Sequence, residues 1–386
     1  MARPKKIKRY GNIYGGRNSS PGGALKVIAM ILAFLLIVAV GYFLASKFLG
    51  GAHDPVSSGD VPVASASSEE PAASDWQPSS SSTSSEPAKT QLVSAVQLPQ
   101  AMLSDTVKIK AFVEQAKADG YTSVLIPMKD QKGNLLYASK LEKAATWKSI
   151  APGAVDAAAV ATAVEEAGLT PIAHIYAFLD DVASNAAYDN AITYGTTTGT
   201  TWLDNAKEKG GKSWLNPYKS SAREYICEIA NELITSGFKQ VLVDGIQFPP
   251  VSLKQANLQD GGVPQDQILK QFIQELEDAG NILVAYKWSA LSGLTTSLYG
   301  GDPTTYGEDT ASPIIDLSEY KKGLALPDGS TLTTPGDITT YLMQQAQTAA
   351  GSDTQLVPVI AAGQQNDAII QALKSLGIES YIVLSE

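Results

Sequence analysis

The sequence predicts an α/β fold, a (β/α)8 TIM-like barrel, that begins near residue 91. Short apolar, β-branched runs alternate from there with segments of helical periodicity, which is typical of a parallel sheet covered by helices. About eight such strands fit between residues 92 and 384, the number that closes a barrel. No glycine-rich phosphate loop follows a strand, which disfavours the alternative of a doubly wound, nucleotide-binding open sheet.

The individual elements follow from two hydrophobic periods. In the first helix, Ile109, Phe112, Val113 and Ala116 recur at positions i, i+3, i+4 and i+7, which places them on one face. The same reasoning predicts strands at 121–128, 170–178, 240–244, 281–288, 356–361 and 380–385, and helices at 155–168, 221–237, around 269–276 and around 369–376.

Three segments of different composition precede the barrel. Residues 1–26 carry seven Lys and Arg and no acid, and residues 27–46 contain no charged side chain. That apolar length of 20 residues matches a bilayer and exceeds the apolar region of a cleaved signal peptide. We expect a single-pass cell-membrane anchor with a cytoplasmic basic arm, since positive charges stay inside. The Ser-, Pro- and Glu-rich segment 47–90 is predicted to be a disordered linker that holds domain 91–386 outside the cell.

Charge and cysteine usage exclude several classes of function. The net charge is −10, of which the basic arm contributes +7, so the remainder carries −10 − 7 = −17. A nucleic-acid surface needs clustered cations, so we expect no nucleic-acid partner. The chain has one cysteine, Cys227, and two histidines, His53 and His174, which disfavours structural zinc. No dense carboxylate cluster suggests calcium, and neither a metal nor a cofactor is expected.

Polar side chains follow several predicted strands. In "QVLVDGIQFPP", residues 240–250, an apolar strand runs directly into Asp244 before a Phe-Pro-Pro stop. A charge there needs solvent or a partner, and barrel active sites lie at these strand ends. We expect Asp244 to face the barrel mouth. The other strand ends supply Lys129, Asp130, Asp180, Asp181, Tyr286, Lys287 and Trp288. Each of these taken singly is better explained as an ordinary loop charge or helix cap, and it is their convergence at four strand ends that indicates a site.

The long connection 181–219 carries aromatic residues among polar ones. Trp202, Trp214 and Tyr218 lie there, in a loop longer than most barrel connections. Long ordered loops often bind ligands, and aromatic rings stack on sugars. The same rings could equally form a local core that keeps the loop folded.

Several motifs, taken in order, resemble those of one family. The second-strand pattern I-D-V-K-D-x-x-G stands at 126–133, and the third-strand pattern A-R-I-V-x-F-K-D at 173–180. W-v-D-P-Y stands at 214–218 and F-D-Y-V-R-F-P at 243–249. D-x-I-S-P-M-x-Y-P-S-x-Y is partly kept between Asp309 and Tyr320. This part of the chain resembles the putative glycoside hydrolase domain family of uncharacterised bacterial surface barrels, similar in architecture to the alpha-amylase clan.

The resemblance implies a polysaccharide ligand and a set of site residues. Asp244 matches the strand-four acid and is the catalytic candidate, with Asp130, Asp180 and Asp309 as candidate second acids. The implied substrate-binding residues are Lys129, His174, Tyr176, Trp214, Asn216, Tyr218, Gln247, Tyr286 and Trp288.

Four departures from the family pattern bear on chemistry. Pro127 and Asn216 replace aspartates, Gln247 replaces an arginine, and Tyr286 lies near the position of an acid. Glycoside hydrolysis normally needs two carboxyl groups, and only Asp244 is plainly kept. One hypothesis is therefore a membrane-anchored hydrolase acting on a cell-envelope or extracellular polysaccharide. The alternatives are a catalytically degenerate barrel that binds such a glycan, or a scaffold for envelope proteins. A second carboxyl group at the mouth would favour the enzyme.

Overall fold

The computed structural model describes residues 94–195, 200–288, 298–307 and 309–385. The predicted arm, membrane span and linker, residues 1–26, 27–46 and 47–90, lie outside the described residues. Among the helices of the described ranges, none has the length and apolar character needed to cross a bilayer. The fold below is therefore that of the predicted barrel domain.

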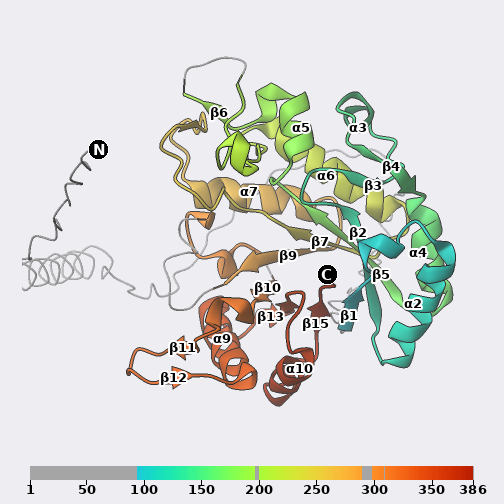
Figure 1. The fold of residues 1–386 in the computed structure, drawn as a ribbon, viewed down its shortest axis with the longest axis vertical. Helices are drawn as coiled ribbons and strands as arrows, with labels where there is room; N and C mark the ends of the chain where they lie inside the picture. The colour runs from blue at the N-terminus through green and yellow to red at the C-terminus, as the bar shows by residue number, and fades with distance from the viewer. Residues whose placement is uncertain (1–93, 196–199, 289–297, 308, 386) are drawn as a thin grey trace, which may run out of the picture. The chain divides into compact units, whose positions relative to one another are not determined.

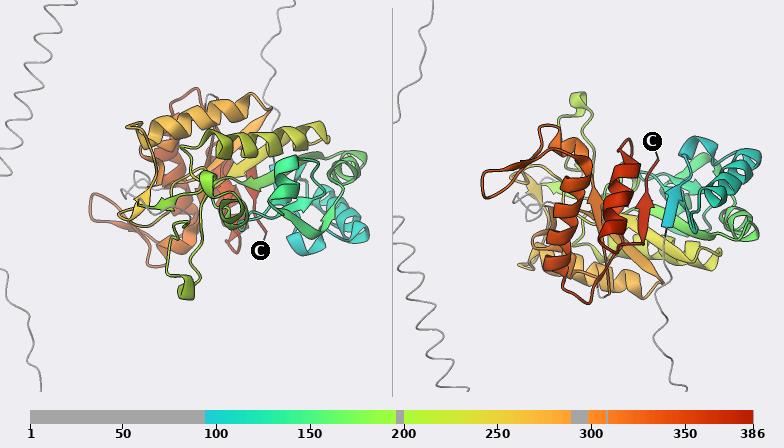
Figure 2. Two further views of the ribbon diagram at one scale, coloured as in Figure 1. Left: turned by 90° about the horizontal axis from the view of Figure 1, so that it is seen from above. Right: turned by 90° about the horizontal axis from the view of Figure 1, so that it is seen from below.

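Eight parallel strands form a closed barrel, as the sequence predicted. They are β1 (Ser94–Gln97), β2 (Ser123–Lys129), β5 (Thr170–Tyr176), β7 (Gln240–Asp244), β9 (Ile282–Lys287), β10 (Thr310–Ile315), β14 (Val359–Ile360) and β15 (Tyr381–Val383). Closure comes from β1, which pairs in parallel with both β2 and β15. The last strand, dark red, therefore lies beside the first, blue, in Figure 1 and in the right-hand view of Figure 2.

Helices connect the strands on the outside of the barrel (Figure 1). The helices are α2 (Thr106–Ala118), α3 (Glu142–Thr146), α4 (Ala157–Glu166), α5 (Asp181–Ala186), α6 (Ser220–Thr235), α7 (Gln265–Glu277), α9 (Pro335–Ala350) and α10 (Asn366–Ser375). Several begin at side-chain caps that satisfy their free backbone N–H groups. The Asp105 carboxylate accepts from the second and third residues of α2, and Asp156 does the same for α4.

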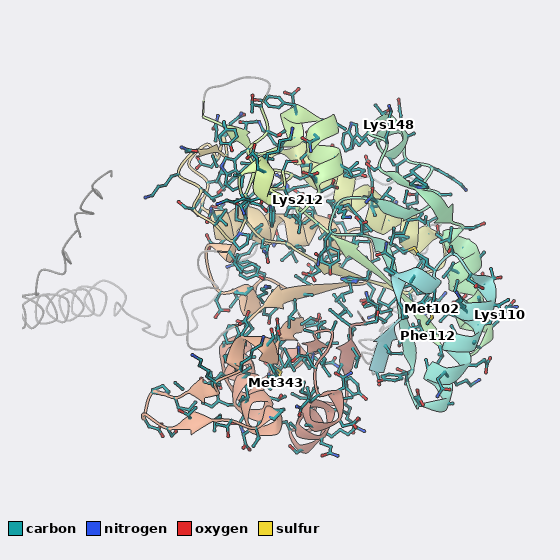
Figure 3. The ribbon with its side chains drawn as sticks, in the orientation of Figure 1. Met102, Lys110, Phe112, Lys148, Lys212 and Met343 are labelled. Carbon is teal, nitrogen blue, oxygen red and sulfur yellow. The ribbon has the colours of Figure 1, made fainter. Side chains whose placement is uncertain are left out.

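Two apolar layers hold the barrel together. Alternate strand residues fill its interior, namely Ala95, Leu125, Ile172, Leu242, Leu283, Ala285, Val357, Val359 and Ile382. The residues between them face the helices and join a larger outer core. Helix α2 shows the matching amphipathic pattern, since Phe112 packs against that core while Lys110 is exposed (Figure 3). The alternation fixes which strand-end side chains face the mouth.

Short elements decorate the loops between strands and helices. After β2, strands β3 (Leu135–Tyr137) and β4 (Ile150–Val155) extend the sheet, and β13 (Gln355–Leu356) pairs with β10. Antiparallel pairs join β6 (Thr193–Tyr194) to β8 (Ala256–Asn257), and β11 (Leu324–Ala325) to β12 (Thr331–Leu332). The 3-10 turns are η1 (Gln100–Met102), η2 (Tyr188–Asn190), η3 (Lys207–Lys209), η4 (Pro303–Thr305) and η5 (Leu317–Tyr320).

Candidate functional site at the barrel mouth

Asp244 is the last residue of β7, at the carboxyl end of a central barrel strand. It lies two residues beyond the interior Leu242, so the alternation directs its side chain inward and into the mouth. The next helix, α7, begins only at Gln265, so Asp244 does not cap it. Gly245 follows in the left-handed region at φ +71°, a conformation that glycine adopts without strain.

The surroundings of Asp244 shift its proton affinity. Burial raises the pKa of the Asp244 carboxyl to about 6, while the N–H of Gly245 and the charge of Lys287 act in the opposite direction. The Gly245 N–H donates to Asp244 Oδ1 at 2.5 Å. Near neutral pH this carboxyl group therefore exchanges its proton readily, as a general acid or a hydroxyl-binding group can.

Two aromatic side chains of β5, Tyr176 and His174, lie on the same side of the barrel wall as Asp244. Tyr176 is its direct strand partner across the β5–β7 pair, and His174 precedes Tyr176 on the same face. The two rings are tilted, with centroids 4.9 Å apart. Burial, and then the charge of Asp244, raise the pKa of the Tyr176 hydroxyl, so Tyr176 remains a neutral donor.

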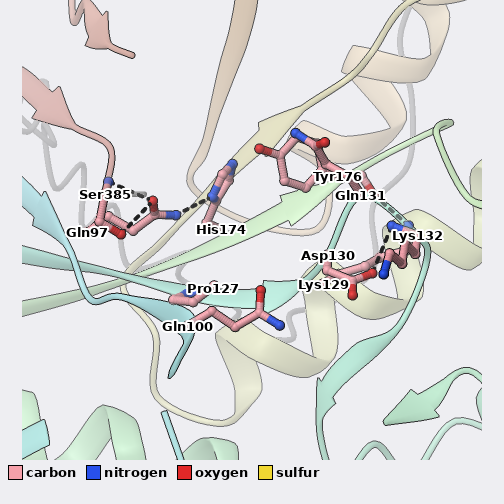
Figure 4. A pocket seen from close by; sticks show the side chains of 10 residues that line it. All are labelled: Gln97, Gln100, Pro127, Lys129, Asp130, Gln131, Lys132, His174, Tyr176 and Ser385. Carbon is pink, nitrogen blue, oxygen red and sulfur yellow. Dashed lines mark hydrogen bonds between the residues drawn. The ribbon is translucent and has the colours of Figure 1, made fainter. Parts of the chain in front are cut away.

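A cavity of about 340 Å³ opens beside these residues (Figure 4). It is lined by Gln97, Gln100, Pro127, Lys129, Asp130, Gln131, Lys132, His174, Tyr176 and Ser385. Its size is at the lower end of the range for small-molecule sites. The wall therefore combines amide, hydroxyl, imidazole and carboxylate groups from β1, β2, β5 and the end of β15.

The ammonium group of Lys129 makes all of its polar contacts within the protein. Its Nζ donates to the carbonyl oxygens of Tyr176 at 2.6 Å and Ala177 at 3.3 Å, and lies 2.9 Å from Asp180 Oδ2. Neither side chain of the Lys129–Asp180 pair has any exposed surface. An ammonium group has three protons, so none is left for a ligand.

A β-bulge explains why Lys129 does not face the mouth. The pairing of β2 with β5 shifts register between Pro127 and Lys129, so that Lys129 lies opposite Ile175. Ile175 belongs to the outer core, and the extra residue turns Lys129 to the same side. Without the bulge, simple alternation from Leu125 would direct Lys129 inward.

Unlike Asp244, each of the three candidate second acids is buried in an ion pair, hydrogen-bonded within its own turn, or distant from the barrel mouth. Asp180 is sealed with Lys129 and also accepts from the backbone N–H of Ala183 at 2.7 Å, as the cap of α5. Asp130 lines the cavity, but its carboxylate accepts three hydrogen bonds, two from Asn134 and one from the Lys132 N–H. Asp309 directly precedes β10, so it lies at the opposite, amino end of the barrel.

The aromatic residues of the long loop form its local core. Trp214 is buried and its Nε1 donates to Asp204 Oδ2 at 3.0 Å. Asn216, also buried, donates to the Leu258 carbonyl at 2.7 Å. The hydroxyl of Tyr218 donates to the Val263 carbonyl at 2.9 Å. Of the two interpretations, the structure therefore favours the folded loop over a sugar-stacking surface.

The remaining predicted binding residues lie around β9. Tyr286 belongs to the outer core and is 2 % exposed, so its ring faces away from the barrel interior. Gln247 accepts from the Tyr299 hydroxyl at 3.3 Å. Trp288 is partly buried against the outer core, at the last residue described before 298. The structure thus groups His174, Tyr176 and Asp244 at the mouth, with Asp130 beside them.

Four further residues lie at the carboxyl ends of strands, namely Gln97, Ser385, Lys287 and Asp316. Lys287 was expected at a strand end, whereas Gln97, Ser385 and Asp316 were not predicted from the sequence. Gln97 and Lys287 are the last residues of β1 and β9, and Asp316 follows β10, where it caps η5. The same signal that identified Asp244, a polar residue flush with an apolar strand, was present for Gln97 and Asp316. Among the described residues, no group of three or more His, Cys, Asp or Glu is placed to hold a metal ion.

Residues 95–286 match the family model described as "Putative glycosyl hydrolase domain". This part of the chain, which spans β1 through β9, therefore belongs to that family, and the resemblance seen in the motifs is confirmed. No curated protein matches the chain.

Solved structures with a similar fold include three described here. A hypothetical protein from Ruminiclostridium thermocellum is 20% identical, with 49% of this chain and 96% of that chain covered and a TM-score of 0.44. The alpha-galactosidase of Thermus thermophilus is 11% identical, with coverages of 77% and 62% and a TM-score of 0.46. A family 20 beta-N-acetylglucosaminidase is 10% identical, with coverages of 76% and 64% and a TM-score of 0.44. This chain spans less than two thirds of the length of the two hydrolases.

Proposed function

We propose that this glycoside hydrolase-like barrel binds a cell-envelope or extracellular polysaccharide at its mouth, with Asp244 as the central acid. The observation that carries the proposal is the contrast among the four predicted acids. Asp244 alone combines a place at the mouth with a carboxylate that is neither sealed in an ion pair nor saturated by its own turn.

The chemistry of the wall suits a polyhydroxylated ligand. Carboxylate and amide oxygens accept from sugar hydroxyls, and amide N–H groups and the Tyr176 hydroxyl donate to them. Gln97, Gln100 and Gln131 supply such groups in the cavity wall, and Asp244 lies opposite the lining residue Tyr176 on the neighbouring strand. The family membership of residues 95–286 supports the same ligand class.

Binding without turnover is the function that the site supports best. Hydrolysis needs one carboxyl group to protonate the leaving oxygen and a second as nucleophile or base. Asp180 is sealed by Lys129, Asp309 lies at the other end of the barrel, and the carboxylates of Asp130 and Asp316 accept hydrogen bonds within their own turns. Hydrolysis is retained as the second candidate function, because a pKa of about 6 suits Asp244 to act as a general acid.

The substitution Asp244→Asn tests the proposal. We expect it to weaken binding of isolated cell-wall polysaccharide by at least about tenfold, since a charge-assisted hydrogen bond contributes on the order of 1.5–3 kcal/mol. Titration calorimetry of the full-length protein in detergent measures this. The matched control is Asp309→Asn, an exposed acid at the other end of the barrel.

The two candidate functions separate in the same preparation. Release of reducing ends from the polysaccharide by the unaltered protein, lost in Asp244→Asn, would establish hydrolysis. Binding without release establishes the non-catalytic barrel. Equal affinities of Asp244→Asn and Asp309→Asn would reject both.

We further propose that residues 27–46 anchor the protein in the cell membrane, with arm 1–26 cytoplasmic and the barrel outside. The uncharged run of 20 residues and the seven flanking cations support this arrangement. Protease added to intact protoplasts should remove the barrel and spare the arm, as detected with a tag at each end. Protection of the barrel would overturn the orientation.

A further inference from the structure

Gln97 is held in one orientation by a contact across the seam where the barrel closes. The backbone N–H of Ser385 donates to Gln97 Oε1 at 3.0 Å, and the Ser385 hydroxyl lies 3.3 Å from the same atom. Since a backbone N–H can only donate, the atom facing it must be the amide oxygen. The NH₂ group of Gln97 therefore points the other way, toward β5.

That orientation determines the tautomer of His174. Gln97 Nε2 lies 2.8 Å from His174 Nδ1 and can only donate to it, so Nδ1 carries no proton (Figure 4). The single proton of the neutral ring is then on Nε2. Burial lowers the pKa of His174 to about 4, so the ring stays neutral at physiological pH.

The Nε2–H group of His174 has no hydrogen-bond partner among the residues that the structure describes. His174 is 2 % exposed, and Nε2 makes no hydrogen bond. A buried donor left unsatisfied costs on the order of 1–3 kcal/mol. His174 lines the 340 Å³ cavity together with Gln97 and Tyr176. An oxygen atom of a ligand bound in this cavity can therefore accept the hydrogen bond of the His174 Nε2–H group.

The charges of the cavity wall indicate an uncharged ligand. Lys129 is neutralised by Asp180 at 2.9 Å, and the remaining charged lining residues are one acid, Asp130, and one cation, Lys132. A site for an anion such as a uronate or phosphate would present an excess of free cations. The sum here is zero, and the other groups are amides and hydroxyls.

We propose that this cavity is a subsite for one neutral hexose unit, in which the Nε2–H of His174, set by the Ser385–Gln97 contact, donates to a sugar oxygen. The inference rests on the proposed carbohydrate-binding function and adds the specificity-determining residue and the ligand's charge.

The experiment follows His174 directly in the full-length protein. Glucose, galactose, N-acetylglucosamine and, as the anionic probe, glucuronate are titrated into ¹⁵N-histidine-labelled protein. The chain has two histidines, and the signal missing from a His174→Gln sample identifies His174. In free protein we expect the Nε2–H tautomer, and at saturation with at least one neutral sugar we expect the Nε2 signal to move.

Two substitutions then separate the donor from packing. His174→Phe removes the donor, and we expect at least a tenfold higher Kd for that sugar. His174→Gln places an amide N–H near the former Nε2, and we expect a Kd within about threefold of the unaltered protein. Glucuronate should bind more weakly than the neutral sugar. If His174→Phe fails to fold, the movement of the Nε2 signal in the unaltered protein decides.

The outcomes distinguish this inference from the proposed function. A sugar that binds in an Asp244-dependent way without moving the His174 signal overturns the inference and leaves the function standing. The inference is also overturned, and the function also stands, if the polysaccharide binds but none of the monosaccharides does. Tighter binding of glucuronate than of the neutral sugars has the same consequence. Polysaccharide binding unaffected by Asp244→Asn overturns the function instead. An Nδ1–H tautomer in free protein would remove the basis of the inference.

Discussion

Asp180 and Asp244 are both acids that follow neighbouring strands of the same barrel, yet their environments are opposite. Asp180 has no exposed side-chain surface, with the Lys129 ammonium 2.9 Å away and α5 capped by its carboxylate. Asp244 is partly exposed, and no salt bridge joins it to a cation in the described part of the chain. Position near the end of a strand therefore does not by itself define the function of an acid. The environment of the acid depends on whether a neighbouring strand places a buried cation beside it. For Asp180 that cation is Lys129, whose position follows from the β-bulge in β2.

Of the substitutions proposed here, breaking the buried Lys129–Asp180 pair should have the largest effect on the free energy of unfolding. Lys129→Met leaves the Asp180 charge buried without its partner, and we expect the free energy of unfolding to fall by about 3–5 kcal/mol. Urea unfolding followed by circular dichroism measures it. The double substitution Lys129→Met/Asp180→Asn, which keeps the α5 cap and removes the stranded charge, should recover about half of the loss. No recovery would show that Lys129 acts mainly through the carbonyls of Tyr176 and Ala177.

The backbone that encloses Asp180 should give the next largest effect. A Cβ at Gly133 would lie 1.8 Å from Asp180 Oδ1, and its φ of +97° disfavours any side chain. For Gly133→Ala we expect a loss of about 1–2 kcal/mol from the backbone conformation and about 1–3 kcal/mol from the clash.

Gly153→Ala is the matched control, since Gly153 has φ +77° but nothing within 4 Å of an added Cβ. The difference between the two variants in urea isolates the enclosure of Asp180. Equal losses would mean that Asp180 has room to move and is not sealed.

Substitution of Asp244, the acid at the barrel mouth, should have the smallest effect on the free energy of unfolding, and that effect should depend on pH. The folded-state pKa of Asp244 is raised to about 6 from an ordinary value of 3.8. A raised carboxyl pKa stabilises the fold below the unfolded value, and that stabilisation is lost as pH rises from about 4 through 6. Asp244→Asn should therefore lack this part of the decline and be no less stable than the unaltered protein at pH 7.

Thermal unfolding of both proteins at pH 4, 5, 6 and 7 checks that prediction. Only the difference between the two curves is informative, because other carboxyl groups titrate in the same range. A Tm of Asp244→Asn several degrees lower at pH 7 would place Asp244 among the structural acids, beside Asp180.

Much of the fold could be predicted because it depends on local periodicity. The runs at 121–128 and 240–244 are apolar enough to be buried strands whatever surrounds them, and the face of Ile109 and Val113 predicts α2. Asp244 was identifiable because it follows its strand without a break. The role of the loop aromatics could not be predicted from the sequence. Trp214 donates its hydrogen bond to Asp204 only once the loop has folded back on itself.

Three features can be derived from the amino-acid sequence alone: strands alternate with helices, each strand ends at a recognisable position, and Asp244 is the last residue of one strand. These properties follow from side-chain hydrophobicity repeated at fixed spacing along a few residues. Which strand-end groups meet one another depends instead on the folded barrel. The bulge that turns Lys129 outward arises from pairing with β5, and the contact that orients Gln97 joins residues 288 positions apart. Such contacts form when the barrel closes, because hydrogen-bond geometry depends on distances in space that no local pattern records.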